Sequence, residues 1–185
     1  HLRPIFDAIE QGDFEAAAKL CIAQFTGRKP YWLYAARIGS ELLLRLGRHE
    51  EARLLFEAIL KARAIPWAKL GVARAQIEAG HPTRAVATLM GLIGEDPGYA
   101  DAYDVLGRAQ VEMGHFAEAI ETYRTASELT PDSVVRLQKL GMMCYYMGER
   151  ATAVQVLSRA VVLGIDSKLF DYQSLVLLAF AYFDE

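Results

Sequence analysis

Glycine recurs along this chain with a period close to 34 residues. Five glycines lie 35, 33, 34 and 34 residues apart, and an alanine follows each of them after five positions. The five are Gly12, Gly47, Gly80, Gly114 and Gly148. Such self-similarity is typical of repeat proteins, in which each unit contacts mainly its neighbours and the array presents a long surface. We therefore expect function to reside in a surface rather than in a catalytic cluster.

The unit with the clearest pattern spans residues 100–132 and predicts two helices joined by a turn at Gly114. Gly107 and Ala119 leave room for the two helix backbones to approach, and Tyr123 fills the space beside them. Pro131 ends the second helix because proline lacks a backbone donor and clashes with the preceding turn. This arrangement of small, aromatic and breaker residues resembles the tetratricopeptide repeat.

The same offsets hold in the other units. Seven residues before the turn glycines stand Ile5, Ser40, Ala73, Gly107 and Gly141, which are small in four units of five. Nine residues after them stand the apolar or aromatic residues Cys21, Phe56, Leu89, Tyr123 and Leu157. The pattern departs from the family at Ile5 and at Lys69, which replaces the tyrosine of the clearest unit, and it is weakest over residues 1–30.

The apolar positions recur at helical spacing, and glycine and proline stand between the periodic segments, so we predict an all-α fold. The resemblance implies a right-handed α-solenoid of five helix-turn-helix units plus one trailing helix. Expected helices span residues 2–11, 13–27, 31–46, 48–63, 66–79, 82–94, 99–113, 116–129, 133–147, 150–163 and about 168–183. We assign residues 1–185 to a single domain, with units at about 1–30, 31–65, 66–99, 100–133 and 134–167 and a trailing helix at 168–185.

Composition argues against several classes of protein. A net charge of −3 and a pI near 5.9 argue against nucleic-acid binding, which requires a face of clustered Lys and Arg residues. The longest apolar run, residues 174–183, is shorter than the ~20 residues that span a bilayer, so we predict no membrane insertion. Cys21 and Cys144 belong to no metal or redox motif, and we expect both to be core thiols in a cytoplasmic protein.

The titratable residues do not form a catalytic pattern. His49, His81 and His115 each follow a turn glycine, which separates them by at least one helix diameter of ~10 Å. That distance is too large for a shared metal held by bonds of ~2 Å. Carboxylate pairs such as Glu50 and Glu51 lack a partnered nucleophile. We therefore predict no catalytic residues, no metal, no cofactor and no enzymatic activity.

The resemblance implies that the first helices of successive repeats line a concave binding groove. The corresponding stripe mixes aromatic and charged residues, as protein-contacting surfaces do. Its predicted partner-binding residues are Tyr34, Arg37, Glu41, Trp67, Leu70, Arg74, Asp101, Asp104, Arg108, Gln138, Met142, Tyr145 and Tyr172. We expect Trp67 and Tyr145 to be anchors for a protein, peptide or helix, and about a third of the wider stripe to pack against the next repeat instead. The Lys/Asn clamp by which some family members hold a chaperone's acidic tail has no counterpart here, although the arginines suit isolated carboxylates.

A narrower resemblance suggests a role in signalling. Four segments, residues 2–21, 66–80, 132–141 and 164–182, together resemble the repeat region of bacterial two-component response regulators that carry a receiver domain ahead of tetratricopeptide repeats. Such a receiver would lie before His1. We hypothesise a noncatalytic protein-protein interaction scaffold that serves as the output or regulatory module of a signalling protein. A helical-repeat nucleic-acid-binding module and an assembly factor for an envelope or appendage complex are the alternatives.

The chain begins without methionine and ends inside the first helix of a sixth repeat, so we expect it to be a fragment of a longer protein. The apolar side of its trailing helix would then lack a covering helix. We expect self-association through Leu175, Leu178, Phe180 or Tyr182, and less of it in a version extended by one helix.

Overall fold

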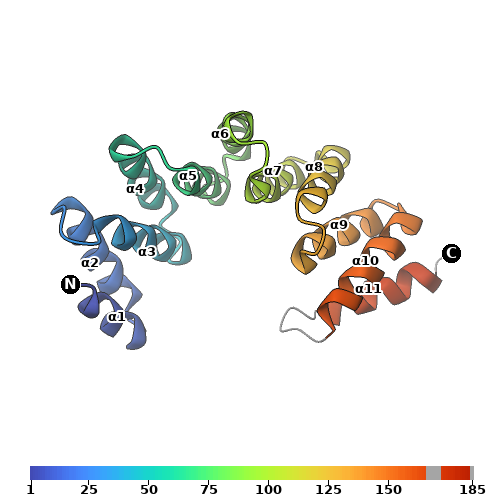
Figure 1. Ribbon diagram of the computed structural model, residues 1–185, viewed down its shortest axis with the longest axis horizontal. Coiled ribbons are helices and arrows are strands. Elements are labelled where there is room, and N and C mark those ends of the chain that lie inside the picture. Colours follow the sequence, from blue (N-terminus) through green and yellow to red (C-terminus); the bar gives the residue numbers. More distant parts are fainter. Residues whose placement is uncertain (166–171, 184–185) are drawn as a thin grey trace. The chain divides into compact units, whose positions relative to one another are not determined.

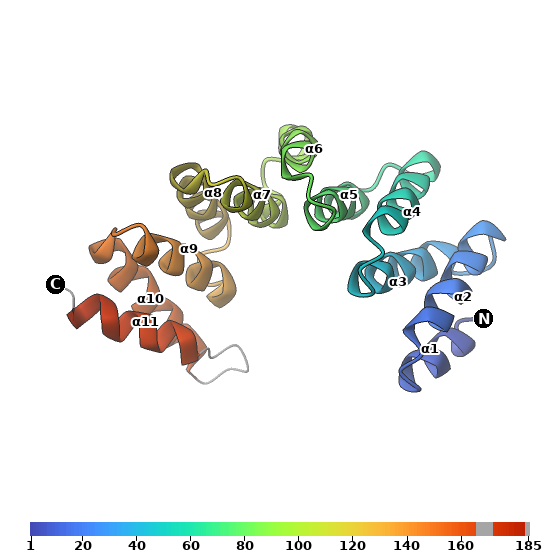
Figure 2. The same ribbon diagram turned by 180° about the vertical axis from the view of Figure 1, so that it is seen from behind.

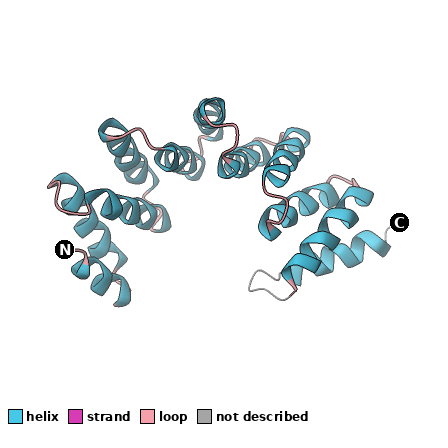
Figure 3. Ribbon diagram, in the orientation of Figure 1, coloured by secondary structure: helices cyan, strands magenta, loops and turns pink. Residues whose placement is uncertain are grey.

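The computed structural model describes residues 1–165 and 172–183, and within these ranges it contains helices and turns but no strand (Figures 1 and 3). The described helices are α1 (Arg3–Glu10), α2 (Phe14–Thr26), α3 (Trp32–Arg45), α4 (His49–Ala62), α5 (Pro66–Glu78), α6 (Pro82–Glu95), α7 (Ala100–Glu112), α8 (Phe116–Leu129), α9 (Val134–Tyr146), α10 (Arg150–Gly164) and α11 (Tyr172–Phe183). The all-α prediction is confirmed, and the expected bounds of α1 to α10 agree with these to within one residue. The expected start of the trailing helix, residues 168–171, lies outside the described residues.

Packing divides the chain into two compact units, His1–Leu92 and Ile93–Glu185, with the division inside α6. In the first unit each helix from α1 to α5 packs against the next, and α3 also contacts α5. In the second unit each helix from α7 to α11 packs against the next, and α9 also contacts α11 (Figures 1 and 2). Two pairs of first helices from neighbouring repeats therefore meet, α3 with α5 in the first unit and α9 with α11 in the second. The single-domain assignment stays a prediction.

The repeating glycine marks one backbone conformation used five times. The five turn glycines have φ between +74° and +80°, a left-handed region that favours a residue without a Cβ. After α3, the Gly47 N–H donates to the Leu44 carbonyl at 3.1 Å and the Arg48 N–H donates to the Leu43 carbonyl at 2.9 Å. The same pair of bonds closes the other four turns, and it is the Schellman arrangement that ends many helices at glycine.

The residues at fixed offsets from these glycines form the core. All five alanines that follow the turns are fully buried, and the five residues nine positions after the turns are at most 7% exposed. The repeat register is therefore confirmed. Cys21 and Cys144 are also fully buried, and burial raises the pKa of each thiol to about 11. Both thiols are therefore protonated at neutral pH and are poor nucleophiles.

Helix backbones approach most closely at glycines that face a large neighbour. A Cβ placed on Gly107 would lie 2.6 Å from the Tyr123 ring, and one placed on Gly141 would lie 2.6 Å from Leu157. Both approaches join the two helices of one repeat, as the sequence pattern predicts.

The first unit uses different glycines for its close approaches. Our register placed Ser40 and Ala73 at the small-residue sites, and both are buried. A Cβ on Gly39 would lie 2.7 Å from the Cys21 Cβ, however, and one on Gly71 would overlap the Phe56 ring. These two glycines pack against the second helix of the preceding repeat, a contact that the pattern within one repeat does not reveal.

Candidate functional site

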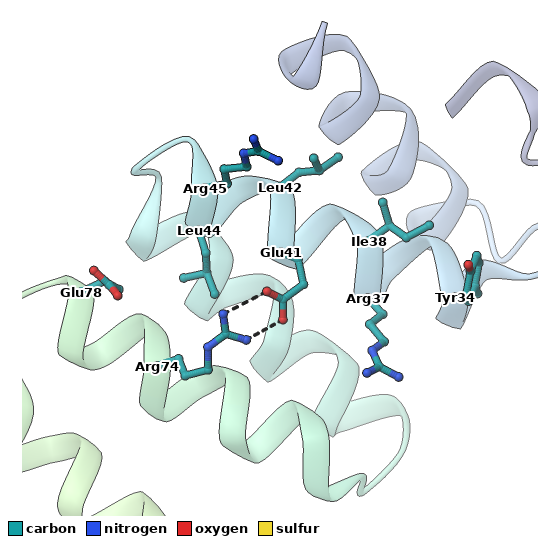
Figure 4. Close-up of a pocket in the computed structure, with 9 residues that line it drawn as sticks. All are labelled: Tyr34, Arg37, Ile38, Glu41, Leu42, Leu44, Arg45, Arg74 and Glu78. Carbon is teal, nitrogen blue, oxygen red and sulfur yellow. Dashed lines mark hydrogen bonds and ion pairs between the residues drawn. The ribbon is translucent and has the colours of Figure 1, made fainter. Parts of the chain in front are cut away.

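A pocket of about 680 Å³ lies on the first-helix surface of the first unit (Figure 4). Seven of its nine lining residues come from α3 and two, Arg74 and Glu78, come from α5. Tyr34, Arg37 and Glu41 follow one another at helical spacing, which places them on one face of α3. With Arg74, they are four of the predicted partner-binding residues that the structure brings together.

A bidentate ion pair crosses this pocket. The Arg74 guanidinium donates to both Glu41 carboxylate oxygens, at 2.7 and 3.0 Å, and so links α5 to α3 (Figure 4). The side chains are 37% and 48% exposed, and a pair this open to solvent stabilises a fold by about 1 kcal/mol at most. Its larger consequence is for the pocket, because the charge of Arg74 is already neutralised by Glu41.

Two further arginines of the pocket rest on aromatic rings. The Arg37 guanidinium carbon lies 5.4 Å from the centroid of the Trp67 ring, and that of Arg45 lies 4.7 Å from the Phe14 ring. Cation–π stacking of this kind restrains a long side chain while leaving the edge of the guanidinium able to donate hydrogen bonds. Within the described part of the chain, neither arginine forms an ion pair with a carboxylate.

The two predicted anchors are less accessible than a freely exposed aromatic. Trp67 is half-buried and packs edge-on against Phe56, with ring centroids 6.3 Å apart. Tyr145 is half-buried against the core of the second unit and contacts Tyr146 at 5.6 Å between centroids. Tyr34 is instead 52% exposed. We therefore assign Trp67 a supporting position beneath Arg37.

In the second unit the predicted acidic residues belong to an ion network. The Arg136 side chain, 13% exposed, donates to Asp101, to Asp104 at 2.8 Å and to Thr130 at 2.9 Å. Lys139 reaches the other Asp104 oxygen at 3.2 Å. Asp101 and Asp104 lie on α7 and the basic residues lie on α9, so the network joins neighbouring first helices. Sequence reasoning missed Arg136, although its spacing of about one repeat from both aspartates was a usable signal.

The remaining predicted residues also lie on first helices, and none of them is buried. Arg108 donates to Glu112 of its own helix at 3.2 Å, and Leu70, Gln138 and Met142 are half-buried. Tyr172, at the start of α11, is 74% exposed. Their participation in binding stays a prediction, because none of their described contacts points to a particular ligand.

Charge is divided unequally between the two units. Residues 1–92 contain thirteen Lys and Arg and nine Asp and Glu, whereas residues 93–185 contain seven and fourteen. The formal net charges are therefore +4 and −7, which add to the −3 of the whole chain. The overall charge conceals a basic first half that holds the pocket.

Among the described residues, none of the helices combines the length and the apolar character needed to cross a bilayer. Nor does any group of three or more His, Cys, Asp or Glu side chains there lie in a metal-binding arrangement.

Comparisons with known proteins identify the repeat. A model of the tetratricopeptide repeat family matches residues 76–141, whereas no curated protein matches the chain. TTC0263, a thermophilic tetratricopeptide-repeat protein of Thermus thermophilus, is 18% identical, with 98% of this chain and 97% of that chain covered and a TM-score of 0.74. MamA of Desulfovibrio magneticus RS-1 is 20% identical, with 89% and 93% covered and a TM-score of 0.70. YrrB, described as having an unusual peptide-binding site, is 17% identical, with 93% and 87% covered and a TM-score of 0.61.

At these identities, the likeness to the solved structures concerns the fold. The family match covers the junction of the two units, and the structural matches extend over most of the chain. Residues 76–141 are therefore tetratricopeptide repeats by sequence, and the chain as a whole has the fold of a tetratricopeptide-repeat protein.

Proposed function

We propose that this chain is a noncatalytic protein-interaction module that binds a peptide or helix of a partner on its first-helix surface. The pocket on α3 and α5 carries the proposal, because it combines an exposed aromatic, aliphatic walls and restrained arginines on one side of a repeat array. The peptide-binding site named for YrrB, which shares the fold, supports it. The buried thiols, with pKa values near 11, give no support to an enzyme that uses cysteine.

The cellular role that we propose is the output or regulatory module of a cytoplasmic bacterial signalling protein. This finer proposal rests on the four segments that resemble the repeat region of response regulators. The nucleic-acid and assembly-factor alternatives predict different partners, so identifying what the surface captures separates all three.

Replacing Tyr34 with alanine is expected to reduce partner capture at least about fivefold without altering helix content. Tyr34 is 52% exposed, so its truncation removes contact area for a ligand and little core packing. Capture from cell extract by the immobilised chain is measured by quantitative mass spectrometry, and circular dichroism reports the fold. Trp67→Ala and Tyr145→Ala are also expected to reduce capture, but these half-buried residues call for a stability correction.

The matched control is Glu121→Lys on α8, a second helix, where the side chain is 72% exposed. Capture should be unchanged in this variant. Loss of the same partners in Glu121→Lys and their retention in Tyr34→Ala would place the binding surface on the second helices and refute the proposal.

We also propose self-association through α11. Its Ser174, Leu177 and Ala181 are buried in the second unit, whereas Phe180 and Tyr182 are 53% and 55% exposed. The double variant Phe180→Ser/Tyr182→Ser is expected to shift the chain toward monomer in sedimentation velocity at matched concentration, since exposed apolar area favours association. Leu54→Ser, at a 55% exposed leucine on α4, is the control. Equal monomer content in the wild type and the double variant would remove this proposal.

A further inference from the structure

The pocket on α3 and α5 has a surplus of positive charge. Arg37, Arg45 and Arg74 line it together with two carboxylates, Glu41 and Glu78. Glu41 neutralises Arg74 through their bidentate pair. The charged lining residues therefore sum to +1, and Arg37 and Arg45 are the arginines that this pair does not engage. The unit that holds them has a net charge of +4.

These two arginines are restrained in a way that suits binding. Each guanidinium lies over an aromatic ring, Trp67 for Arg37 and Phe14 for Arg45, so less side-chain freedom is lost when a ligand binds. The rings cover one face of each guanidinium group, and the N–H groups at its edge can still donate hydrogen bonds to a ligand. Carboxylates match those edges bidentately, which makes them the natural acceptors.

The positions of the arginines set the spacing of those acceptors. Arg37 and Arg45 are eight residues apart on α3, about 12 Å along a helix that rises 1.5 Å per residue. Arg37 extends toward α5 and Arg45 leaves α3 on the other side, with Glu41 between them (Figure 4). An extended peptide advances ~3.3 Å per residue, so a segment that crosses α3 from one side to the other needs acidic residues at least about four positions apart to reach both arginines.

We propose that this pocket binds an extended acidic segment of a protein partner, with one carboxylate on Arg37 and a second on Arg45. The proposal rests on the proposed interaction function and adds the chemistry of the ligand. Tyr34, at the edge of the pocket, contacts the apolar part of the segment. Glu41 faces the middle of the segment and disfavours a further carboxylate there, so two acidic residues about four positions apart bind better than an alternating or unbroken acidic run.

Fluorescence anisotropy with a defined probe tests the proposal. The probe is a fluorescein-labelled eight-residue peptide with glutamate at positions 2 and 6 and alanine elsewhere, and its comparator has glutamine in place of both glutamates. At about 50 mM salt the glutamate peptide is expected to bind about tenfold tighter than the comparator, because charge-assisted hydrogen bonds exceed neutral ones. Equal affinities for the two peptides would overturn the proposal.

Two variants of the protein sharpen the test. Arg37→Ala/Arg45→Ala is expected to weaken the glutamate peptide about tenfold, whereas Arg3→Ala/Arg63→Ala removes the same charge from exposed positions outside the pocket and is expected to change affinity less than about twofold. Equal losses of affinity in the two double variants would mean that binding depends only on the net charge of the unit, which would overturn the proposal.

Glu41→Gln removes the carboxylate that neutralises Arg74. This variant should bind the glutamate peptide severalfold more tightly, a gain that misfolding does not produce. Unchanged or weaker binding by this variant counts against the proposal.

The same samples separate other occupants of the pocket. A salt-sensitive dimer of the wild type, lost in Arg37→Ala/Arg45→Ala, would assign the pocket to the acidic half of a second copy instead of a partner's peptide. If Tyr34→Ala loses captured partners while the glutamate peptide fails to bind, the interaction function stands and the acidic ligand is excluded.

Discussion

Gly107→Leu is expected to lower the midpoint of thermal unfolding by about 2 to 12 °C. A Cβ at this position would already lie 2.6 Å from the Tyr123 ring, and leucine adds three more carbons at the crossing of α7 and α8. Overpacking of a well-packed core destabilises proteins by about 1 to 3 kcal/mol, and in a chain of this size each kcal/mol corresponds to about 2 to 4 °C. Circular dichroism at 222 nm during heating measures the effect.

Gly91 provides the matched control. It is an exposed glycine of α6, and a Cβ placed on it meets no atom within 4 Å. Gly91→Ala is therefore expected to raise stability by about 0.5 to 1 kcal/mol through higher helix propensity. An unchanged midpoint for Gly107→Leu would mean that the crossing of α7 and α8 admits a large side chain at this position without a loss of stability, and the overpacking argument would be wrong.

Arg136→Ala is the second substitution with a large expected effect, a loss of about 2 kcal/mol in the free energy of unfolding. Its removal deprives Asp104, which is only 15% exposed, of the arginine that it contacts at 2.8 Å, while Lys139 stays at 3.2 Å. Removing one member of a largely buried ion pair is costly because the other charge stays desolvated. Urea titration followed by circular dichroism gives the change in free energy.

Arg159→Ala is the corresponding control on the surface. Arg159 pairs with Asp132 at 3.1 Å, but the two side chains are 53% and 81% exposed. We expect a change below about 0.5 kcal/mol, as is usual for exposed pairs. Similar stabilities for Arg136→Ala and Arg159→Ala would show that the network between α7 and α9 contributes no more than an exposed pair.

The helices were predictable because their boundaries depend on local chemistry. A left-handed turn at Gly114 or Gly148 is specified by the glycine and the few residues that bond across it, so its position can be read from the sequence. The buried alanines and the residues nine positions after each turn follow the same period. Facing positions within a repeat, such as Gly107 and Tyr123, were predictable for this reason.

Contacts between repeats were harder to predict. Gly71 faces Phe56 across a repeat boundary, and the half-buried position of Trp67 depends on Phe56 as well. The stacking of Arg37 on Trp67 requires the relative placement of two helices whose residues are about 30 positions apart. A period within each unit carries no information about such placements. The unequal charge of the two halves was readable from the sequence, but the net charge of the whole chain hid it.

The turns also determine where the chain tolerates added residues. Each turn closes its own hydrogen bonds, and a Cβ placed on Gly12, Gly80, Gly114 or Gly148 would meet no atom within 4 Å. Peptide tags or whole loops inserted at these turns should leave the flanking helices intact. A complete repeat can likewise be duplicated or lost without any change to the turns that connect its helices. Arrays of different lengths, suited to ligands of different lengths, can therefore evolve from a single motif.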